Sequence, residues 1–211
     1  DRLQAALLSV MCRTERVGMT RDRDAMLVDA PRLAALLPAD LEHARVADQA
    51  ARSVGAPDTL EYWKSSPYLL NFLKYYDFRR RVDALQKDPP ADLLATLAAA
   101  GDAMLRKRQF DAYQAISPAN ARMRALYADT LDKGLWRLLW LPPSLPYTAP
   151  AGAYAGVGAV TKALVFSAWN LVPDAIATLV SYEAERRMVT AWDTTIRHDA
   201  LYDRIKPLLR F

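Results

Sequence analysis

Cysteine, histidine and glycine are scarce in this sequence of 211 residues, which contains one, two and seven of them respectively. The single cysteine, Cys12, excludes an internal disulfide, and its place in an apolar helical pattern predicts a buried, reduced thiol. His43 and His198 are far apart and have no cysteines or paired carboxylates nearby, which argues against a zinc site. The Gly-x-Ser-x-Gly elbow of many Ser-His-Asp hydrolases does not occur.

Long apolar runs are also missing. The most apolar region, 151–180, is interrupted by Lys162, Asn170, Pro173 and Asp174. A membrane-spanning helix needs about 20 predominantly apolar residues, so these interruptions argue against one. No secretory segment is visible either, and we therefore expect a cytoplasmic protein.

The composition is that of a chain that folds around a core. Hydrophobic residues make up 52% of the sequence, enough for one compact domain or for parts of two. Basic residues number 28 and acidic residues 24, for a formal net charge of +4. This mild excess permits an anionic partner, but it fits an ordinary solvated surface equally well.

The spacing of apolar residues changes sharply once, within 161–187, from a continuous run to a helical repeat. Ala163–Phe166 is a short apolar run rich in strand formers, which predicts a strand buried on both faces and therefore parallel to its neighbours. Ser167 marks the end of that strand. Pro173 then fits the first turn of a helix, whose apolar residues recur at helical spacing as far as Ala184. The pattern predicts half of a βαβ unit.

Polar and aromatic residues lie at this change of periodicity. Ligands of open α/β sheets bind beyond the carboxyl ends of the strands, where Ser167, Trp169 and Asn170 are expected. A serine hydroxyl and the first N–H groups of a helix suit a phosphate. Alternatively, Ser167 only ends the strand and Asn170 only caps the helix. Trp169 either packs against the edge of the sheet, the simpler interpretation, or stacks on a base.

Capping and breaking residues divide the rest of the chain. They predict helices over 2–16, 38–55, 66–85, 91–100 and 117–134, and a short strand over 137–141 that is followed by a proline-rich loop. We therefore expect a mainly α chain with a partial α/β unit. Its helical insertion should span 31–135.

A second candidate site is the aromatic and basic stretch 62–81. Stacking by its tyrosines and phosphate neutralisation by its basic residues would bind a nucleic acid. However, Leu69, Phe72, Leu73 and Tyr76 fit a stripe that faces the core. We therefore expect the exposed part to be the run of Arg79, Arg80 and Arg81, with 106–108 as a weaker basic run.

The order Lys162, apolar run, Phe166, Ser167 and Trp169 resembles motif IV, which opens the second RecA-like domain of superfamily 2 helicases and Swi/Snf-type DNA translocases. The segment 7–16, LLSVMCRTER, is similar to the segment just after the first RecA-like domain of that family. Two further stretches, 61–73 and 139–147, resemble bacterial helicase-related proteins, some of which are linked to defence against foreign DNA.

The resemblance implies a fragment of a motor. Residues 1–30 would end the first RecA-like lobe, 31–135 would form a helical insertion, and 136–211 would begin the second lobe. Residues around motif IV in this family contact the sugar-phosphate backbone, a role that would fall to Ser167, Trp169 and Asn170. The family requires ATP and Mg²⁺, but the Walker A loop, the acidic magnesium-binding pair and the arginine-finger motif are absent here. We therefore expect no ATP hydrolysis and no cofactor for this chain alone.

Two classes of function remain open. The first is a noncatalytic part of an ATP-dependent DNA translocase. The second is a helical module that binds a partner protein through its apolar and aromatic faces. Binding to a nucleic-acid backbone must weaken steeply as salt rises, whereas an apolar interface should change little, so salt dependence separates the two.

Overall fold

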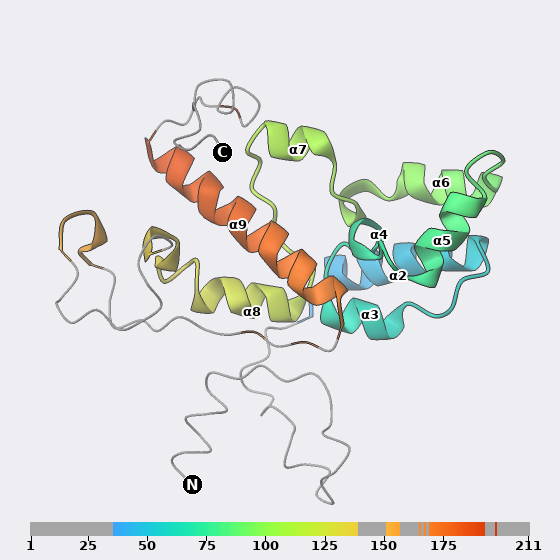
Figure 1. Ribbon diagram of the computed structural model, residues 1–211, viewed down its shortest axis with the longest axis horizontal. Coiled ribbons are helices and arrows are strands. Elements are labelled where there is room, and N and C mark those ends of the chain that lie inside the picture. The colour runs from blue at the N-terminus through green and yellow to red at the C-terminus, as the bar shows by residue number, and fades with distance from the viewer. Residues whose placement is uncertain are drawn as a thin grey trace, which may run out of the picture.

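The computed structural model describes residues 36–138, 151–156 and 169–192, with the single residues 165, 167 and 197 (Figure 1). This part of the chain is mainly helical and contains no strand. In chain order its elements are α2 (Pro38–Ser53), α3 (Leu60–Ser65), α4 (Leu69–Phe72), α5 (Asp77–Ala84), α6 (Ala91–Ala99), η2 (Gly101–Ala103), α7 (Lys107–Asp111), α8 (Ala121–Asp129), η3 (Leu135–Leu138), η4 (Gly152–Tyr154) and α9 (Leu171–Trp192).

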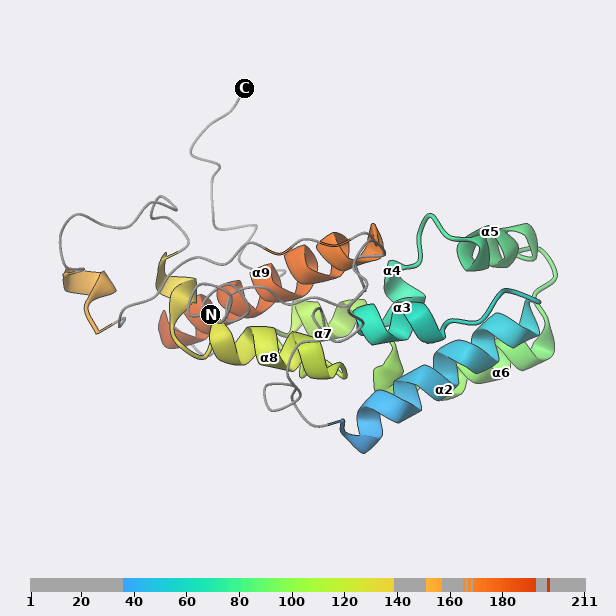
Figure 2. The same ribbon diagram turned by 90° about the horizontal axis from the view of Figure 1, so that it is seen from below.

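Helix α2 begins and ends where the sequence predicts. Pro38 lies in its first turn, and the Asp40 carboxylate accepts a hydrogen bond of 2.9 Å from the Leu37 N–H. Gly55 follows the helix with a left-handed φ of +63°, which a residue with a Cβ adopts only at a cost. Figure 2 shows α6 beside α2 along much of its length. The small buried side chains of Ala47 and Ala50 permit such close packing of helices.

Helix α9 packs into the same core as the helices that precede it. It crosses the described part of the molecule, and its first turn lies beside α4 (Figure 1). Leu171, Ala175 and Leu179 are at most 1% exposed. The Tyr127 hydroxyl of α8 donates a 3.0 Å hydrogen bond to the Leu179 carbonyl. Residues on both sides of the expected boundary between 135 and 136 therefore share one core.

A buried ion pair joins α2 to α8. Arg124 donates two hydrogen bonds, of 2.6 and 2.7 Å, to the two carboxylate oxygens of Asp40, whose side chain is 0% exposed. The hydrogen bond from Arg124 is the main reason that the pKa of Asp40 lies below its ordinary value. Trp63 attaches α3 to the same residue, because its indole N–H donates a 2.9 Å hydrogen bond to the Asp40 carbonyl.

The prediction of one continuous helix over 66–85 is wrong, because two short helices occupy this stretch. The chain forms α4, leaves helical geometry from Leu73 to Tyr76, and begins α5 at Asp77. The stripe that was expected to face the core does so, since Leu73 is 2% exposed. A residue far away in sequence stabilises this break: the Leu171 N–H donates a 3.4 Å hydrogen bond to the Tyr76 hydroxyl.

One expected strand differs from the structure, and a second lies almost wholly outside the described residues. The strand predicted over 137–141 is wrong for its first two residues, which belong to η3. The left-handed φ of +82° at Gly134 turns the chain there, and the Gly134 carbonyl accepts a 3.1 Å hydrogen bond from Arg137. Of the buried strand predicted over 163–166, only Val165 is described; it is 45% exposed and belongs to no strand.

The predicted helix over 117–134 begins later than expected, at Ala121. The reason is the Asn120 side chain, which accepts hydrogen bonds of 3.0 and 3.1 Å from the Arg122 and Met123 N–H groups and so caps the helix. The helix predicted over 2–16 lies outside the described residues, as does Cys12.

Loss of the buried ion pair should destabilise the fold. We expect Asp40→Ala to lower the free energy of unfolding by about 3 kcal/mol, because it leaves the Arg124 guanidinium without its carboxylate partner in a largely buried position. Asp48→Ala in the same helix is the matched control: its pair with Arg52 is exposed, so the loss should be below about 1 kcal/mol. Urea unfolding followed by circular dichroism measures both, and equal losses would contradict a special role for Asp40.

Candidate nucleic-acid interface

The start of α9 carries the first group of predicted contact residues. The Ser167 hydroxyl accepts a 3.1 Å hydrogen bond from the Trp169 N–H, and the Trp169 carbonyl accepts one of 3.1 Å from the Val172 N–H. These bonds turn the chain into the helix. The side chains of Ser167 and Asn170 are exposed, so both are accessible to a ligand at the helix N-terminus.

Trp169 is half-buried and packs on α3. Its ring meets the ring of Tyr62 edge to face, with centroids 5.1 Å apart. Tyr62 in turn meets Tyr76 edge to face at 4.9 Å. Trp169 therefore has a packing role, on a helix rather than on the edge of a sheet.

The two sites predicted separately from the sequence are neighbours in the fold. Lys74 Nζ lies 3.1 Å from a carboxylate oxygen of Asp174 in the first turn of α9, and Tyr76 accepts its hydrogen bond from Leu171. Both contacts come from the segment Leu73–Tyr76, which leads directly into α5 and its three arginines. The segment Leu73–Tyr76 thus contacts the start of α9 and leads directly to Arg79–Arg81.

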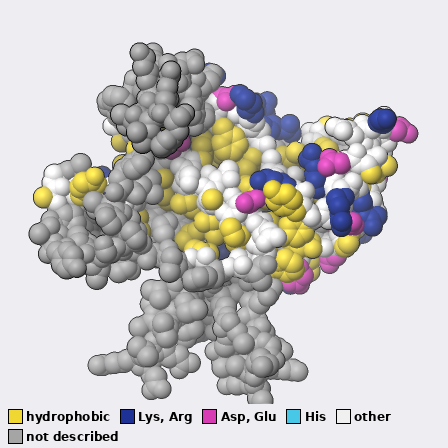
Figure 3. Space-filling model, in the orientation of Figure 1, with side chains coloured by type: hydrophobic (Ala, Val, Ile, Leu, Met, Phe, Trp, Pro, Cys, Tyr) yellow, Lys and Arg dark blue, Asp and Glu magenta, His cyan; other side chains and the backbone are white. Residues whose placement is uncertain are grey.

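Arg79, Arg80 and Arg81 are exposed, at 55, 75 and 45% of their side-chain areas, and each forms an ion pair within α5. Arg79 pairs with Asp83, while Arg80 and Arg81 share Asp77. In Figure 3 Lys and Arg side chains gather, with Asp and Glu among them, on the side where Figure 1 places α5 and α6.

These pairs are weak enough to be exchanged. Exposed ion pairs are typically worth less than about 1 kcal/mol, because water and salt screen them. A phosphate group could therefore take the place of a carboxylate as the partner of each guanidinium. The structure places the whole run at the surface, as the sequence predicted.

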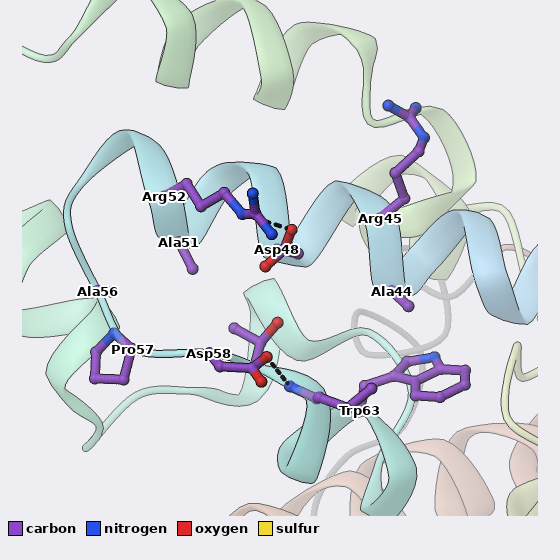
Figure 4. Close-up of a pocket in the computed structure, with 11 residues that line it drawn as sticks. Ala44, Arg45, Asp48, Ala51, Arg52, Ala56, Pro57, Asp58 and Trp63 are labelled. Atoms are coloured by element: carbon purple, nitrogen blue, oxygen red, sulfur yellow. Dashed lines mark hydrogen bonds and ion pairs between the residues drawn. The ribbon is translucent and has the colours of Figure 1, made fainter.

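Sequence reasoning missed a cleft between α2 and α3, with a volume of about 480 Å³ (Figure 4). Its wall is partly apolar, with alanines, Pro57 and Trp63, and charged residues surround it. Those charges have partners within the chain: Arg52 pairs with Asp48 at 2.8 Å, and Asp58 accepts a 2.8 Å hydrogen bond from the Leu60 N–H. The lining comes from one continuous stretch, 44–63, in which α2, the loop after it and α3 fold back on one another.

Among the described residues, no three His, Cys, Asp or Glu side chains lie together in a way that could hold a metal ion. The sequence also has no phosphate-binding loop. In the same part of the chain, no helix combines the length and apolar character needed to cross a bilayer.

No family model, curated protein or solved structure matches this sequence. The resemblance to superfamily 2 helicases therefore depends on the quoted residues alone. Of these, 61–73, Ser167 and Trp169 are described, whereas Lys162, Phe166 and the segments 7–16 and 139–147 lie outside the described residues.

His43 is the one titratable group of α2 that is buried without full hydrogen bonding. Its ring is 8% exposed, lies 5.2 Å from the ring of Tyr68, and leaves Nδ1 with no partner among the described residues. Burial lowers the pKa of His43 below its ordinary 6.5, while the charges of Asp40, Asp102 and Glu42 act in the opposite direction. The lowered pKa favours the uncharged form of this buried ring.

Trp169 allows a direct test of packing against base stacking. We expect Trp169→Ala to lower the free energy of unfolding by about 2 kcal/mol, since it removes the ring contact with Tyr62. Trp169→Phe retains a ring and should recover most of the loss in urea unfolding. Unchanged stability of Trp169→Ala would show that the ring does not pack and would favour the stacking interpretation.

The buried histidine predicts a pH dependence of stability. The unfolded state gains a proton near pH 6.5 and the folded state only at lower pH, so stability present above pH 6.5 should fall as the pH drops from 7 to 5.5. The slope cannot exceed about 1.4 kcal/mol per pH unit for one group. His43→Leu should flatten this slope in urea unfolding. An unchanged slope in His43→Leu would contradict the assignment.

Proposed function

We propose that this chain is part of an ATP-dependent, helicase-like DNA translocase of the cytoplasm, in which it supplies contacts to the nucleic-acid backbone and a helical insertion. Residues 31–135 would be the insertion, and α9 would be the first helix of the second RecA-like domain. One observation carries the proposal: Ser167 and Asn170 are exposed at the start of a 22-residue helix, beside the turn that leads to Arg79–Arg81. ATP and Mg²⁺ would be bound by other parts of the motor.

The start of α9 has the chemistry to hold one phosphate. The first N–H groups of a helix have no partner within it, and the helix dipole adds about half a positive charge there. The Ser167 hydroxyl and the Asn170 amide offer further donors. Asp174 in the first turn opposes an anion, but Lys74 pairs with it at 3.1 Å and offsets its charge.

The three arginines of α5 would extend this contact along a strand. Each can exchange an exposed aspartate for a phosphate, and the exchange releases counterions condensed on the nucleic acid. Affinity should therefore fall as salt rises. Each phosphate contact contributes roughly 0.7 to the slope of log K against log salt concentration for a single strand, and roughly 0.9 for a duplex.

A second candidate function is a helical module that binds a partner protein. The cleft between α2 and α3 favours it, because Trp63 lies in an opening beside Leu60, which is 44% exposed. Leu41 of α2 and Leu94 of α6 are exposed as well, at 56 and 51%. Such a surface would bind through apolar area, with little dependence on salt.

The decisive comparison replaces two basic runs by glutamine. We expect Arg79→Gln/Arg80→Gln/Arg81→Gln to weaken binding of fluorescein-labelled DNA and to lower the salt slope by roughly 2. The matched control is Arg106→Gln/Lys107→Gln/Arg108→Gln, which removes the same charge around the start of α7. Because this is the weaker candidate run, its loss should lower the slope by less than about 1. Fluorescence anisotropy at several salt concentrations measures both, and circular dichroism verifies that each variant is folded.

Equal weakening by the two triple variants would mean that net charge, rather than α5, attracts the DNA. No measurable binding by the unchanged chain would remove the support for the proposed function and leave the interaction module as the better account.

A further inference from the structure

Tyr75 is the most exposed of the large hydrophobic residues in the described part of the chain. Its side chain is 77% exposed, whereas Tyr68, seven residues earlier, is 5% exposed. Burying an aromatic ring is strongly favourable, so most tyrosines in a fold of this kind cover their rings. The neighbouring Tyr76 is partly buried and accepts a hydrogen bond from Leu171. Tyr75 alone in this turn keeps its ring in water.

The backbone that carries Tyr75 is fixed on both sides. Leu73, two residues before it, is 2% exposed in the core. Lys74 is paired with Asp174, and Tyr76 is bonded to Leu171, so both neighbours of Tyr75 are attached to the first turn of α9. An exposed ring on an ordered turn loses little conformational entropy when a ligand covers it.

The charges around this ring favour an anionic ligand. Residues 74–83 contain four cations, Lys74 and the three arginines, against the carboxylates of Asp77 and Asp83, and Asp174 of α9 adds a third carboxylate that pairs with Lys74. Surfaces that bind single-stranded nucleic acids combine cations along the backbone with exposed rings on which bases stack. In a duplex both faces of most bases are already covered by their neighbours, so only an unpaired base offers a free face to Tyr75.

We propose that Tyr75 is a stacking platform for an unpaired nucleic-acid base, placed between the phosphate contacts of α5 and those at the start of α9. The surface therefore prefers a single strand to a duplex. This inference rests on the proposed function, and it adds the class of nucleic acid and a residue that determines the preference.

The test compares Tyr75→Ala with Tyr75→Phe in fluorescence anisotropy, on fluorescein-labelled oligo(dT) and on a hairpin duplex of similar charge. Stacking on an aromatic ring contributes roughly 1 to 3 kcal/mol per base, so Tyr75→Ala should raise the Kd for oligo(dT) by roughly fivefold or more. Tyr75→Phe keeps the ring and should bind like the unchanged chain. Neither substitution should alter the Kd for the duplex.

An oligonucleotide whose bases are replaced by abasic sites serves as the control ligand. It keeps the phosphates but offers nothing to stack, so the unchanged chain and Tyr75→Ala should bind it equally.

The outcomes separate this inference from the proposed function. If Tyr75→Ala leaves oligo(dT) binding unchanged while the glutamine variant of the three arginines weakens it, stacking is wrong and the proposed function stands. If Tyr75→Ala loses affinity equally for oligo(dT), the duplex and the abasic strand, the stacking proposal is also wrong. If the unchanged chain binds none of these probes, both proposals fail.

Discussion

The ion pair between Asp40 and Arg124 is the interaction on which the arrangement of the described helices depends. The two residues are 84 positions apart, and their pairing holds α2 against α8 in the interior. The carbonyl of Asp40 also receives the indole N–H of Trp63, which fixes α3 to the same point. A buried charge without its partner is costly, so loss of either side chain should weaken the contact between the two helices.

The candidate interface depends on that frame through a series of aromatic contacts. Trp63 and Tyr62 are adjacent in α3, and Tyr62 meets both Trp169 at the start of α9 and Tyr76 in the turn before α5. The position of α3 thus sets the positions of both predicted contact sites. The exposed guanidinium, hydroxyl, amide and phenol groups there suit phosphate contact and stacking, although the exposed carboxylates of Asp83 and Asp174 lie among them.

Local signals in the sequence were sufficient for several elements. Proline and glycine mark the ends of α2 and α6, and helical periodicity after Pro173 predicts α9. The break between α4 and α5 could not be predicted locally, because the hydrogen bond between Tyr76 and Leu171 that stabilises it spans 95 residues. The ion pairs of the α5 arginines with Asp77 and Asp83 were not predicted, although spacings of three and four residues are typical of pairs within a helix. The exposure of Tyr75 was not predicted either, since it depends on that break.

Photocrosslinking tests the central claim most directly, because it reports which residues touch the ligand. A single strand that contains 4-thiothymidine would be irradiated with the folded chain, and the crosslinked peptides would be identified by mass spectrometry. The account predicts crosslinks within 74–81 and within 167–170, at Tyr75 first. Crosslinks confined to α7 or α8, or none above those of a denatured control, would contradict it.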